Sequence, residues 1–312
     1  MSRGGVTLPD GYRIRAVDPV ADVPVAAAIQ EACDLFDVGF ADNEEIWVRD
    51  DWNESAHRGA WIVEDASGEP VAFANLAATD PGATIDAYGA ILPPHRGALR
   101  GPLTSYLEAE SRRIGVGTPT MIVALSTTEG AGSVVEPLGF AFSRAFWHME
   151  RPIDRSFEPV APPAGVTLRA YRSPEDDRLG WALLEETFAG HYSIDPKTFE
   201  AYRHDVLEHE RWDPSLVAFA EADGEAVGIV VAEVIEDVGW IDDVGVRGAF
   251  RGRGVGRALL DHGFALLTAR GVKRIQLNVD SKNATGATRL YERAGMTIRR
   301  SFDCYEKRLG SG

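Results

Sequence analysis

A turn rich in glycine and arginine has the composition of an anion-binding site. It reads Val246-Arg-Gly-Ala-Phe-Arg-Gly-Arg-Gly-Val-Gly-Arg257, and it joins a predicted strand over 240–246 to a predicted amphipathic helix over 257–270. The first turn of a helix leaves backbone N–H groups without intrahelical partners, and the helix dipole favours negative charge there. The alternate glycines of the turn let a phosphate approach the backbone without meeting a Cβ atom. The turn therefore predicts a site for a pyrophosphate.

The strand that leads into this turn carries two adjacent carboxylates, Asp242 and Asp243. Side chains alternate between the faces of a strand, so only one of the pair shares a face with Val244 and Val246, and parity selects Asp242. A carboxylate there would attract an ammonium group, and it would act as a general base if desolvation raised its pKa or if water relayed the proton. Glu233, on the neighbouring predicted strand, is a weaker candidate for the same role. The competing interpretation is a solvated carboxylate pair near a strand end.

Regular elements predicted from hydrophobic periodicity surround these residues. We expect helices over 181–187, 196–207, 257–270 and 286–293, strands over 167–170, 216–220, 226–233, 240–246 and 274–279, and a closing strand pair over 296–300 and 303–307. This order contains both hairpins and crossover helices. It predicts a mixed α/β fold built in layers.

The chain also repeats itself at an interval of about 155 residues. Arg13-Ile-Arg-Ala-Val17 resembles Thr167-Leu-Arg-Ala-Tyr171, and Leu138-Gly-Phe140 resembles Ala294-Gly-Met296. Several such landmarks keep one order and a nearly constant offset, which indicates a duplicated domain. A proline-rich segment between the copies favours an extended connector. The expected organisation is a first domain over 1–150, a linker over 151–165 and a second domain over 166–312.

Composition and charge narrow the classes of partner. The formal net charge of −16 disfavours nucleic acid, which requires a basic surface, and it would attract a cationic amine, although solubility explains the acidity equally well. The sequence shows no apolar signal core and no stretch of membrane-spanning length, so we expect no membrane partner. The two cysteines lie in different copies, which favours a reduced, cytoplasmic protein. Histidines and cysteines form no metal-ligand pattern, so we expect no metal, and nothing indicates an oligomeric state.

The motifs of the second copy resemble those of a known superfamily. Arg251-Gly-Arg-Gly-Val-Gly256 fits the pattern Arg/Gln-x-x-Gly-x-Gly/Ala, and Asn283, Leu290-Tyr291 and Gly295-Met296 follow it in the order of the GCN5-related N-acetyltransferases (GNAT). The resemblance covers residues 166–309, and the whole chain resembles tandem GNAT proteins of mycothiol-synthase-like architecture. It implies two tandem GNAT domains, each a mixed twisted sheet flanked by helices.

The resemblance also implies an acyl donor, acetyl-CoA, and the residues that would hold it. The implied cofactor contacts gather around the turn, with one further downstream: Val244, Val246, Arg251, Arg253, Gly254, Val255, Gly256, Arg257, Ala258 and Asn283. It places a general acid at Tyr291, since a phenol of pKa about 10 can protonate a thiolate of pKa about 8.5. A purely packing role is the alternative for this tyrosine.

The first copy lacks residues that this chemistry needs. Leu99 stands where the second copy has Gly254, and its side chain would crowd a phosphate. Val135 stands where the second copy has Tyr291. We therefore expect a degenerate first domain beside a catalytic second domain.

The expected function is transfer of an acetyl group from acetyl-CoA to the primary amine of a small molecule. Tyr291 and Asp242 are the expected catalytic residues, and direct attack is favoured because neither cysteine lies in a nucleophile-like setting. Acetylation of an aminosugar conjugate, an antibiotic, a polyamine or a protein stays open, because fold likeness does not identify a substrate. The alternative from another class is a non-catalytic regulatory protein that binds acyl-CoA.

Overall fold

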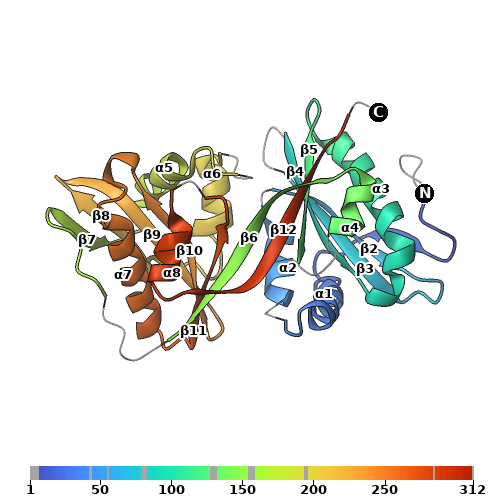
Figure 1. The fold of residues 1–312 in the computed structure, drawn as a ribbon, viewed down its shortest axis with the longest axis horizontal. Coiled ribbons are helices and arrows are strands. Elements are labelled where there is room, and N and C mark those ends of the chain that lie inside the picture. The colour runs from blue at the N-terminus through green and yellow to red at the C-terminus, as the bar shows by residue number, and fades with distance from the viewer. Residues whose placement is uncertain are drawn as a thin grey trace. The chain divides into compact units, whose positions relative to one another are not determined.

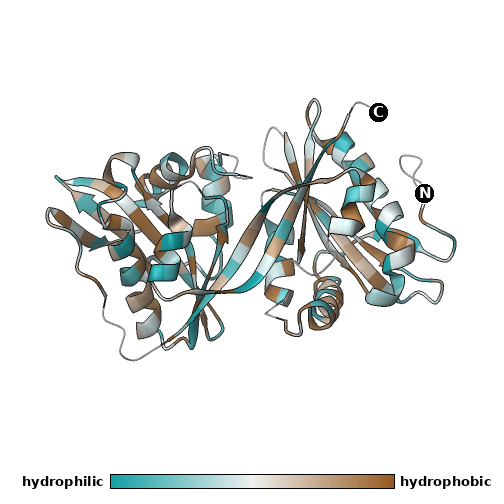
Figure 2. Ribbon diagram, viewed as in Figure 1, coloured by the Kyte–Doolittle hydropathy of each residue, from teal (hydrophilic) through white to brown (hydrophobic). Residues whose placement is uncertain are grey.

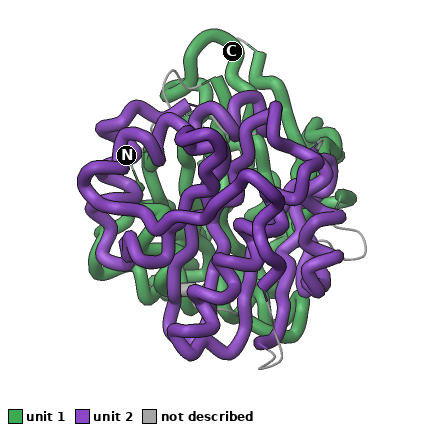
Figure 3. Tube along the Cα trace, turned by 90° about the vertical axis from the view of Figure 1, so that its left-hand side faces the viewer, with its two compact units in different colours: residues 1–144, 302–312 green, residues 145–301 purple. Residues whose placement is uncertain are grey.

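The computed structural model describes residues 7–41, 44–54, 56–78, 83–126, 132–153, 159–192, 196–283 and 285–310. The chain forms two compact units, one of residues 1–144 with 302–312 and the other of residues 145–301 (Figures 1 and 3). We call them unit 1 and unit 2. Each is a mixed α/β unit with a sheet covered by helices.

Unit 1 contains a sheet with the strand order β1-β2-β3-β4-β5-β12. Its elements up to the exchange point are β1 (Arg13–Ala16), α1 (Val23–Asp37), α2 (Glu44–Asn53), β2 (His57–Glu64), β3 (Pro70–Ala77), β4 (Thr84–Ile91), α3 (Arg96–Ile114), β5 (Thr120–Ser126) and α4 (Gly132–Val135). Neighbouring strands are antiparallel except β4 and β5, which are parallel.

Unit 2 repeats this arrangement with the strand order β7-β8-β9-β10-β11-β6. Its elements are β6 (Ala141–Pro152), β7 (Val166–Ala170), α5 (Asp177–Phe188), α6 (Phe199–Tyr202) with a π-helical turn (Arg203–Leu207), β8 (Val217–Ala222), β9 (Glu225–Ile235), β10 (Val238–Val246), α7 (Val255–Ala269), β11 (Arg274–Asp280) and α8 (Ala287–Arg293). The last strand of the chain, β12 (Thr297–Arg308), begins in unit 2 and pairs in unit 1. Here β10 and β11 form the parallel pair. The helices and strands predicted between 167 and 293 are confirmed, with shifts of a few residues at their ends.

In each unit, the strand that follows the parallel pair comes from the other copy. Residues 146–152 of β6, the last strand of the first copy, pair antiparallel with 274–280 of β11 in unit 2. Residues 302–308 of β12, the last strand of the second copy, pair antiparallel with 120–126 of β5 in unit 1. The expected domain boundaries follow the order of the chain, whereas the compact units exchange their final strands.

The closing strand pair expected over 296–300 and 303–307 is absent, and this prediction is wrong. β12 runs without interruption from Thr297 to Arg308. Ser301 and Asp303 are turn-forming residue types, but without Gly, Pro or Asn beside them they do not interrupt the strand.

The sheet of unit 2 is buried on both faces. Alternate residues of β8 and β9 pack on different helices: Ala218, Ala220, Val230 and Ala232 lie in the core with α7, and Val217, Phe219, Ile229 and Val231 lie in the core with α5. This is the near-continuous apolar pattern of strands covered on both sides. Figure 2 shows apolar residues concentrated on the strands, while the helices alternate between apolar and polar faces.

Helix α7 packs on the sheet through one apolar face, and a glycine follows its C-terminal end. Leu259, Phe264 and Leu267 recur at helical spacing and are at most 1% exposed, so each contributes about 2 kcal/mol through burial. Gly271 follows the helix with φ +77°, a left-handed conformation that favours glycine after a helix end.

The duplication is visible in matching ion pairs. In unit 1, Arg15 pairs with Asp22 at 2.6 Å and with Glu64 at 2.7 Å. In unit 2, Arg169 pairs with Asp176 at 2.6 Å and with Glu221 at 2.6 Å. Each arginine fastens the first strand of its unit to the second strand and to the start of the first helix. No helix among the described residues is long and apolar enough to cross a membrane.

Candidate active site

Strands β10 and β11 separate partway along their length. Their parallel pairing covers only 238–240 of β10 and 274–276 of β11. Beyond Trp240, β10 stays paired with β9 on its other side as far as Val246. Main-chain groups of 241–246 that point toward β11 therefore have no ladder partner there and are available to a ligand.

The glycine-rich turn follows β10 and begins α7. A short 3₁₀ turn (Gly248–Phe250) leads into it, and Gly254 is the N-cap of α7 with φ +88° and no side-chain cap. Ala258 donates to the carbonyl of Gly254 at 3.1 Å, and the N–H groups from Gly252 to Arg257 have no backbone acceptor in the described chain. A Cβ atom at Gly254 would have no atom within 4 Å, so the space beside the backbone is open. Consecutive free amides, an open approach and the dipole of a long helix fit a diphosphate.

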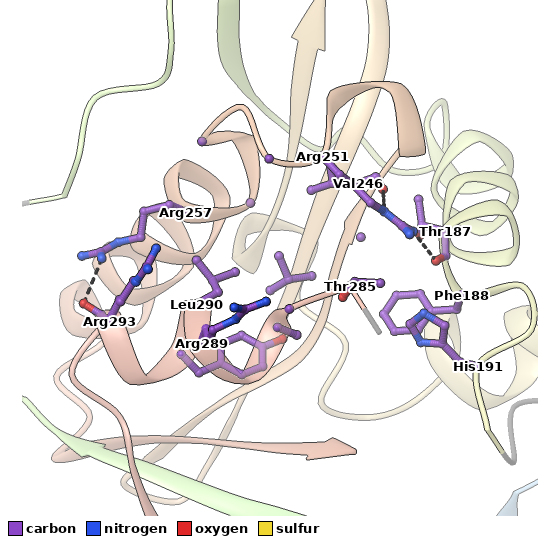
Figure 4. A pocket seen from close by; sticks show the side chains of 18 residues that line it. Thr187, Phe188, His191, Val246, Arg251, Arg257, Thr285, Arg289, Leu290 and Arg293 are labelled. Atoms are coloured by element: carbon purple, nitrogen blue, oxygen red, sulfur yellow. Dashed lines mark hydrogen bonds between the residues drawn. The ribbon is translucent and has the colours of Figure 1, made fainter. Parts of the chain in front are cut away.

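A cavity of about 620 Å³ lies against this turn. It is lined by residues of α5, β10, the turn and α8: Thr187, Phe188, His191, Val244, Gly245, Val246, Arg251, Gly252, Gly254, Gly256, Arg257, Thr285, Gly286, Ala287, Arg289, Leu290, Tyr291 and Arg293. In Figure 4, Arg257 and Arg293 lie on the α7 and α8 side of the cavity, while Phe188 and His191 lie on the α5 side. Its volume falls within the range of small-molecule sites.

Two arginines of the turn are fixed by main-chain carbonyls. Arg251 donates from Nε to the carbonyl of Val246 at 2.9 Å and from Nη2 to that of Thr187 at 3.1 Å (Figure 4). Arg257 donates from Nη1 to the carbonyl of Arg293 at 3.0 Å. Arg251 thus ties the turn to β10 and α5, in addition to lending positive charge to the cavity.

Most of the residues implied as cofactor contacts line the cavity, and some do not. The lining set includes Val244, Val246, Arg251, Gly254, Gly256 and Arg257. Val255 and Ala258 are buried at 1% exposure beneath the turn, so only their backbone could serve a ligand. Arg253 lies over the ring of Phe250 at 5.5 Å. Asn283 accepts hydrogen bonds from the backbone and hydroxyl of Thr285, which places it in the loop before α8.

Tyr291 lines the cavity from α8. Its ring packs in the core of unit 2 and the residue is 8% exposed. Burial raises the pKa of the phenol above its ordinary value, and the negative charge of Asp243 raises it further. The hydroxyl therefore stays protonated at neutral pH and can donate a hydrogen bond, while the raised pKa makes it a weaker acid than an ordinary phenol.

A β-bulge lies at the two aspartates. Opposite β9, Ile241 pairs with Ala232 and Asp243 pairs with Val231, so Asp242 is the extra residue. Directly paired residues share a face, which puts Asp243 on the α5 side with Val231. Asp243 thus lies on the face opposite Val244, which pairs with Val230 on the α7 side, as the alternation predicts. Asp242 is the extra residue of the bulge, so no direct partner in β9 fixes its face.

Both aspartates are unusually basic carboxylates. Burial raises the pKa of Asp243 to about 6, with Lys197 opposing the shift. Burial, together with the charges of Glu233 and Asp243, raises the pKa of Asp242 well above its usual range, against the effect of Arg211. Part of the surface of Asp242 is accessible to water, although many protein atoms surround its carboxylate. Within the described residues neither carboxylate has a hydrogen-bond or ion-pair partner.

Glu233, the weaker candidate, is engaged elsewhere. Its Oε2 accepts from Nε of Arg211 at 2.9 Å, and both side chains are less than one-fifth exposed. The ion pair leaves Asp242 and Asp243 as the unmatched charges at the bulge. Among the residues whose positions are described, no group of three or more His, Cys, Asp or Glu is arranged to hold a metal ion.

The corresponding segment of unit 1 has no such turn. Helix α3 begins at Arg96, so residues 96–101, which correspond to the turn of unit 2, are helical. Leu99 is fully buried in the core of unit 1 and anchors this early helix. The guanidinium of Arg96 pairs with both carboxylate oxygens of Asp37, at 2.7 and 2.8 Å. Val135, at the position of Tyr291, is buried as well.

Several residues that line the cavity from α5 and α8 are not among those expected from the sequence. Thr187, Phe188 and His191 line the cavity from the end of α5, and burial beside Arg251 lowers the pKa of His191. Arg289 and Arg293 lie four residues apart on α8 and add positive charge. The four-residue spacing puts Arg289 and Arg293 on one face of α8, but it gives no signal that this face borders a cavity, since residues at i and i+2, such as Arg289 and Tyr291, do not face each other on a helix.

Comparisons with known proteins identify the family and the fold. The model of the acetyltransferase (GNAT) family matches residues 169–296. A mycothiol acetyltransferase of Beutenbergia cavernae is 31% identical over 249 residues, which cover 72% of this chain and 80% of that protein. A solved GCN5-related N-acetyltransferase from Sphaerobacter thermophilus is 30% identical with a TM-score of 0.83, over 98% of both chains. A tandem GNAT protein from the clavulanic acid biosynthesis pathway shares the fold with a TM-score of 0.74 at 14% identity, over 96% of this chain and 99% of that one. The chain therefore belongs to the acetyltransferase (GNAT) family, as an acyltransferase with a tandem GNAT fold.

Proposed function

We propose that unit 2 transfers an acetyl group from acetyl-CoA to the primary amine of a small molecule. The observation that carries the proposal is the turn of free amides at the start of α7, which opens into one cavity with Tyr291. The diphosphate of the donor fits the amides between Gly252 and Arg257, and the gap between β10 and β11 suits an extended chain beside main-chain donors.

Direct transfer assigns one task to each group of residues. Acetyl-CoA supplies a thioester, whose carbonyl carbon accepts the amine and whose C–S bond breaks as the C–N bond forms. Main-chain N–H groups of β10 near Val246 are placed to stabilise charge on the carbonyl oxygen. Tyr291 gives a proton to the departing sulfur.

Asp242 and Asp243, the two carboxylates at the bulge, act on the acceptor amine. An amine must lose its proton before attack, and Asp242, with its raised pKa, is a better base than an ordinary aspartate. Asp243 adds a second unmatched carboxylate beside it, which favours binding of an ammonium group. The pair supports a cationic small molecule as the acceptor.

A second candidate acceptor is an aminosugar conjugate. It is supported by the similarity to mycothiol acetyltransferases, which reaches 31% identity over 72% of this chain. The different alternative, a regulatory protein that binds acyl-CoA without turnover, leaves the unmatched aspartates and Tyr291 without a role.

The test measures release of free thiol from acetyl-CoA across a panel of amines. We expect turnover with at least one small primary amine. In the Tyr291→Phe variant we expect kcat to fall on the order of 10²-fold while the Kd for acetyl-CoA stays within twofold. Binding of acetyl-CoA without turnover on any amine, or equal kcat in the variant, would contradict the proposed catalysis.

A further inference from the structure

Arg257 lies at a place where a helix does not favour a cation. It is the third residue of α7, within the first turn, where the dipole presents its positive end. Its side chain nevertheless lines the cavity and is 30% exposed. A cation at this position is explained if a negatively charged ligand binds beside it.

The guanidinium of Arg257 is held on two sides. Nε donates to Oδ2 of Asp261 at 2.8 Å. Nη1 donates to the carbonyl of Arg293 at 3.0 Å, as Figure 4 shows. Arg293 is the last residue of α8, two positions after Tyr291. One side chain thus connects the start of α7 to the end of the helix that carries Tyr291.

Asp261 is a fully buried carboxylate outside the motif of the turn. Its side chain is 0% exposed, Oδ2 also accepts from the N–H of Val160 at 3.2 Å, and Oδ1 has no partner in the described structure. Burial of a charge is expensive, so a buried ion pair is weak evidence for stability. An arginine four residues before an aspartate is also the less stabilising orientation on a helix. Stability of α7 therefore does not explain this pair.

The pair occurs only in the copy that has the turn. At the interval of about 155 residues that relates the copies, Pro102 and Tyr106 of α3 stand in place of Arg257 and Asp261. Tyr106 packs in the apolar core of unit 1. The ion pair thus accompanies the phosphate-binding geometry rather than the fold.

We propose that Asp261 is a positioning residue that fixes the Arg257 guanidinium between the end of α8 and the cavity, in the orientation that meets the phosphates of the acyl donor. The inference deepens the proposed function and rests on it. Because Arg257 also donates to the end of α8, Asp261 connects the phosphate-binding side chain to the helix that carries Tyr291.

A double-mutant cycle with coenzyme A as the probe tests this role. We expect Arg257→Gln and Asp261→Asn each to raise the Kd for coenzyme A roughly tenfold. In the double variant the Kd should stay within twofold of that of Arg257→Gln alone, because Asp261 acts through Arg257. If Asp261→Asn weakens binding by the same factor with and without Arg257, its effect is merely structural and the proposal is overturned.

A matched control separates positioning from folding. Asp176 is also buried and paired with an arginine in unit 2, at 2.6 Å from Arg169, but it does not line the cavity. We expect Asp176→Asn to lower the melting temperature without changing the Kd for coenzyme A. If it weakens binding as much as Asp261→Asn does, loss of a buried ion pair explains both effects and the proposal fails.

A second variant keeps the test decisive if Asp261→Asn does not fold. In Arg257→Lys the charge remains, but a single ammonium cannot reproduce the two-sided hold of a guanidinium. We expect a similar roughly tenfold loss of affinity for coenzyme A, and an unchanged Kd would overturn the proposal. Wild-type protein without affinity for coenzyme A would instead refute the proposed function itself.

Discussion

Substitution of Gly254 tests whether main-chain amides hold the donor. Gly254 has φ +88° at the N-cap of α7, and no atom lies within 4 Å of the place where a Cβ would stand. In Gly254→Ala the left-handed backbone costs about 1–2 kcal/mol of folding free energy, while the new methyl group meets no protein atom. A methyl group beside the free amides would push a phosphate away from them. Loss of one charge-assisted hydrogen bond, about 1.5–3 kcal/mol, raises the Kd for coenzyme A roughly ten- to hundredfold.

Gly271 provides the matched control at the other end of the same helix. It has φ +77° and an equally open Cβ position, but it does not line the cavity. We expect Gly271→Ala to lower the free energy of unfolding by a similar amount and to leave the Kd unchanged. Isothermal titration with coenzyme A and thermal unfolding give the two quantities. Equal Kd values for wild type and Gly254→Ala would refute the reasoning that the amides of this turn bind phosphate.

Two further aspects of the chain give testable predictions. Asp242 is the proposed base, and its pKa is raised well above the usual range, in part by the charge of Asp243. We therefore expect kcat/KM to decrease as the pH falls through that raised pKa, and in Asp243→Asn this limb should move to lower pH because Asp242 loses a neighbouring negative charge. A flat profile at acidic pH would contradict the role of these carboxylates. The folded pKa of Asp243 lies above its ordinary value of 3.8, so the folded state binds more protons between these values and stability falls as the pH rises through them. Asp243→Asn should therefore raise the melting temperature at pH 7, and a lower one would show that the carboxylate has a stabilising partner. Leu99→Ala in unit 1 should destabilise the protein by about 2–5 kcal/mol in denaturant titrations, yet titration should still give one coenzyme A per chain, whereas a stoichiometry of two would assign a binding site to unit 1.

The site was predictable where its chemistry is local in the sequence. Gly254 marks a helix start with open amides, and Tyr291 follows at the spacing that places it in the next helix, so both could be placed without coordinates. The face of Asp242 could not be predicted, because a bulge leaves no signature in the residue types around it. The hydrogen bonds of Arg251 to the carbonyls of Val246 and Thr187 also depend on contacts distant in the sequence.

The fold was predictable element by element, but its closing strands were not. Periodicity within 167–293 identifies strands and helices because each pattern reports on its own burial. The partner of a strand is not encoded in that pattern, so nothing in 146–152 or 302–308 indicates that each joins the sheet of the other copy. The early start of α3 at Arg96 has a clearer origin, since Leu99 replaces a glycine and gives the helix an apolar anchor.

The exchange of final strands explains how a copy without a phosphate turn can persist. Deletion of the first half of the chain would remove β6 and leave β11 as an uncovered sheet edge, prone to aggregation. Deletion of the second half would expose β5 in the same way. Loss of either half would therefore expose a strand edge in the other, so the exchange alone would favour retention of unit 1, whether or not it binds a ligand.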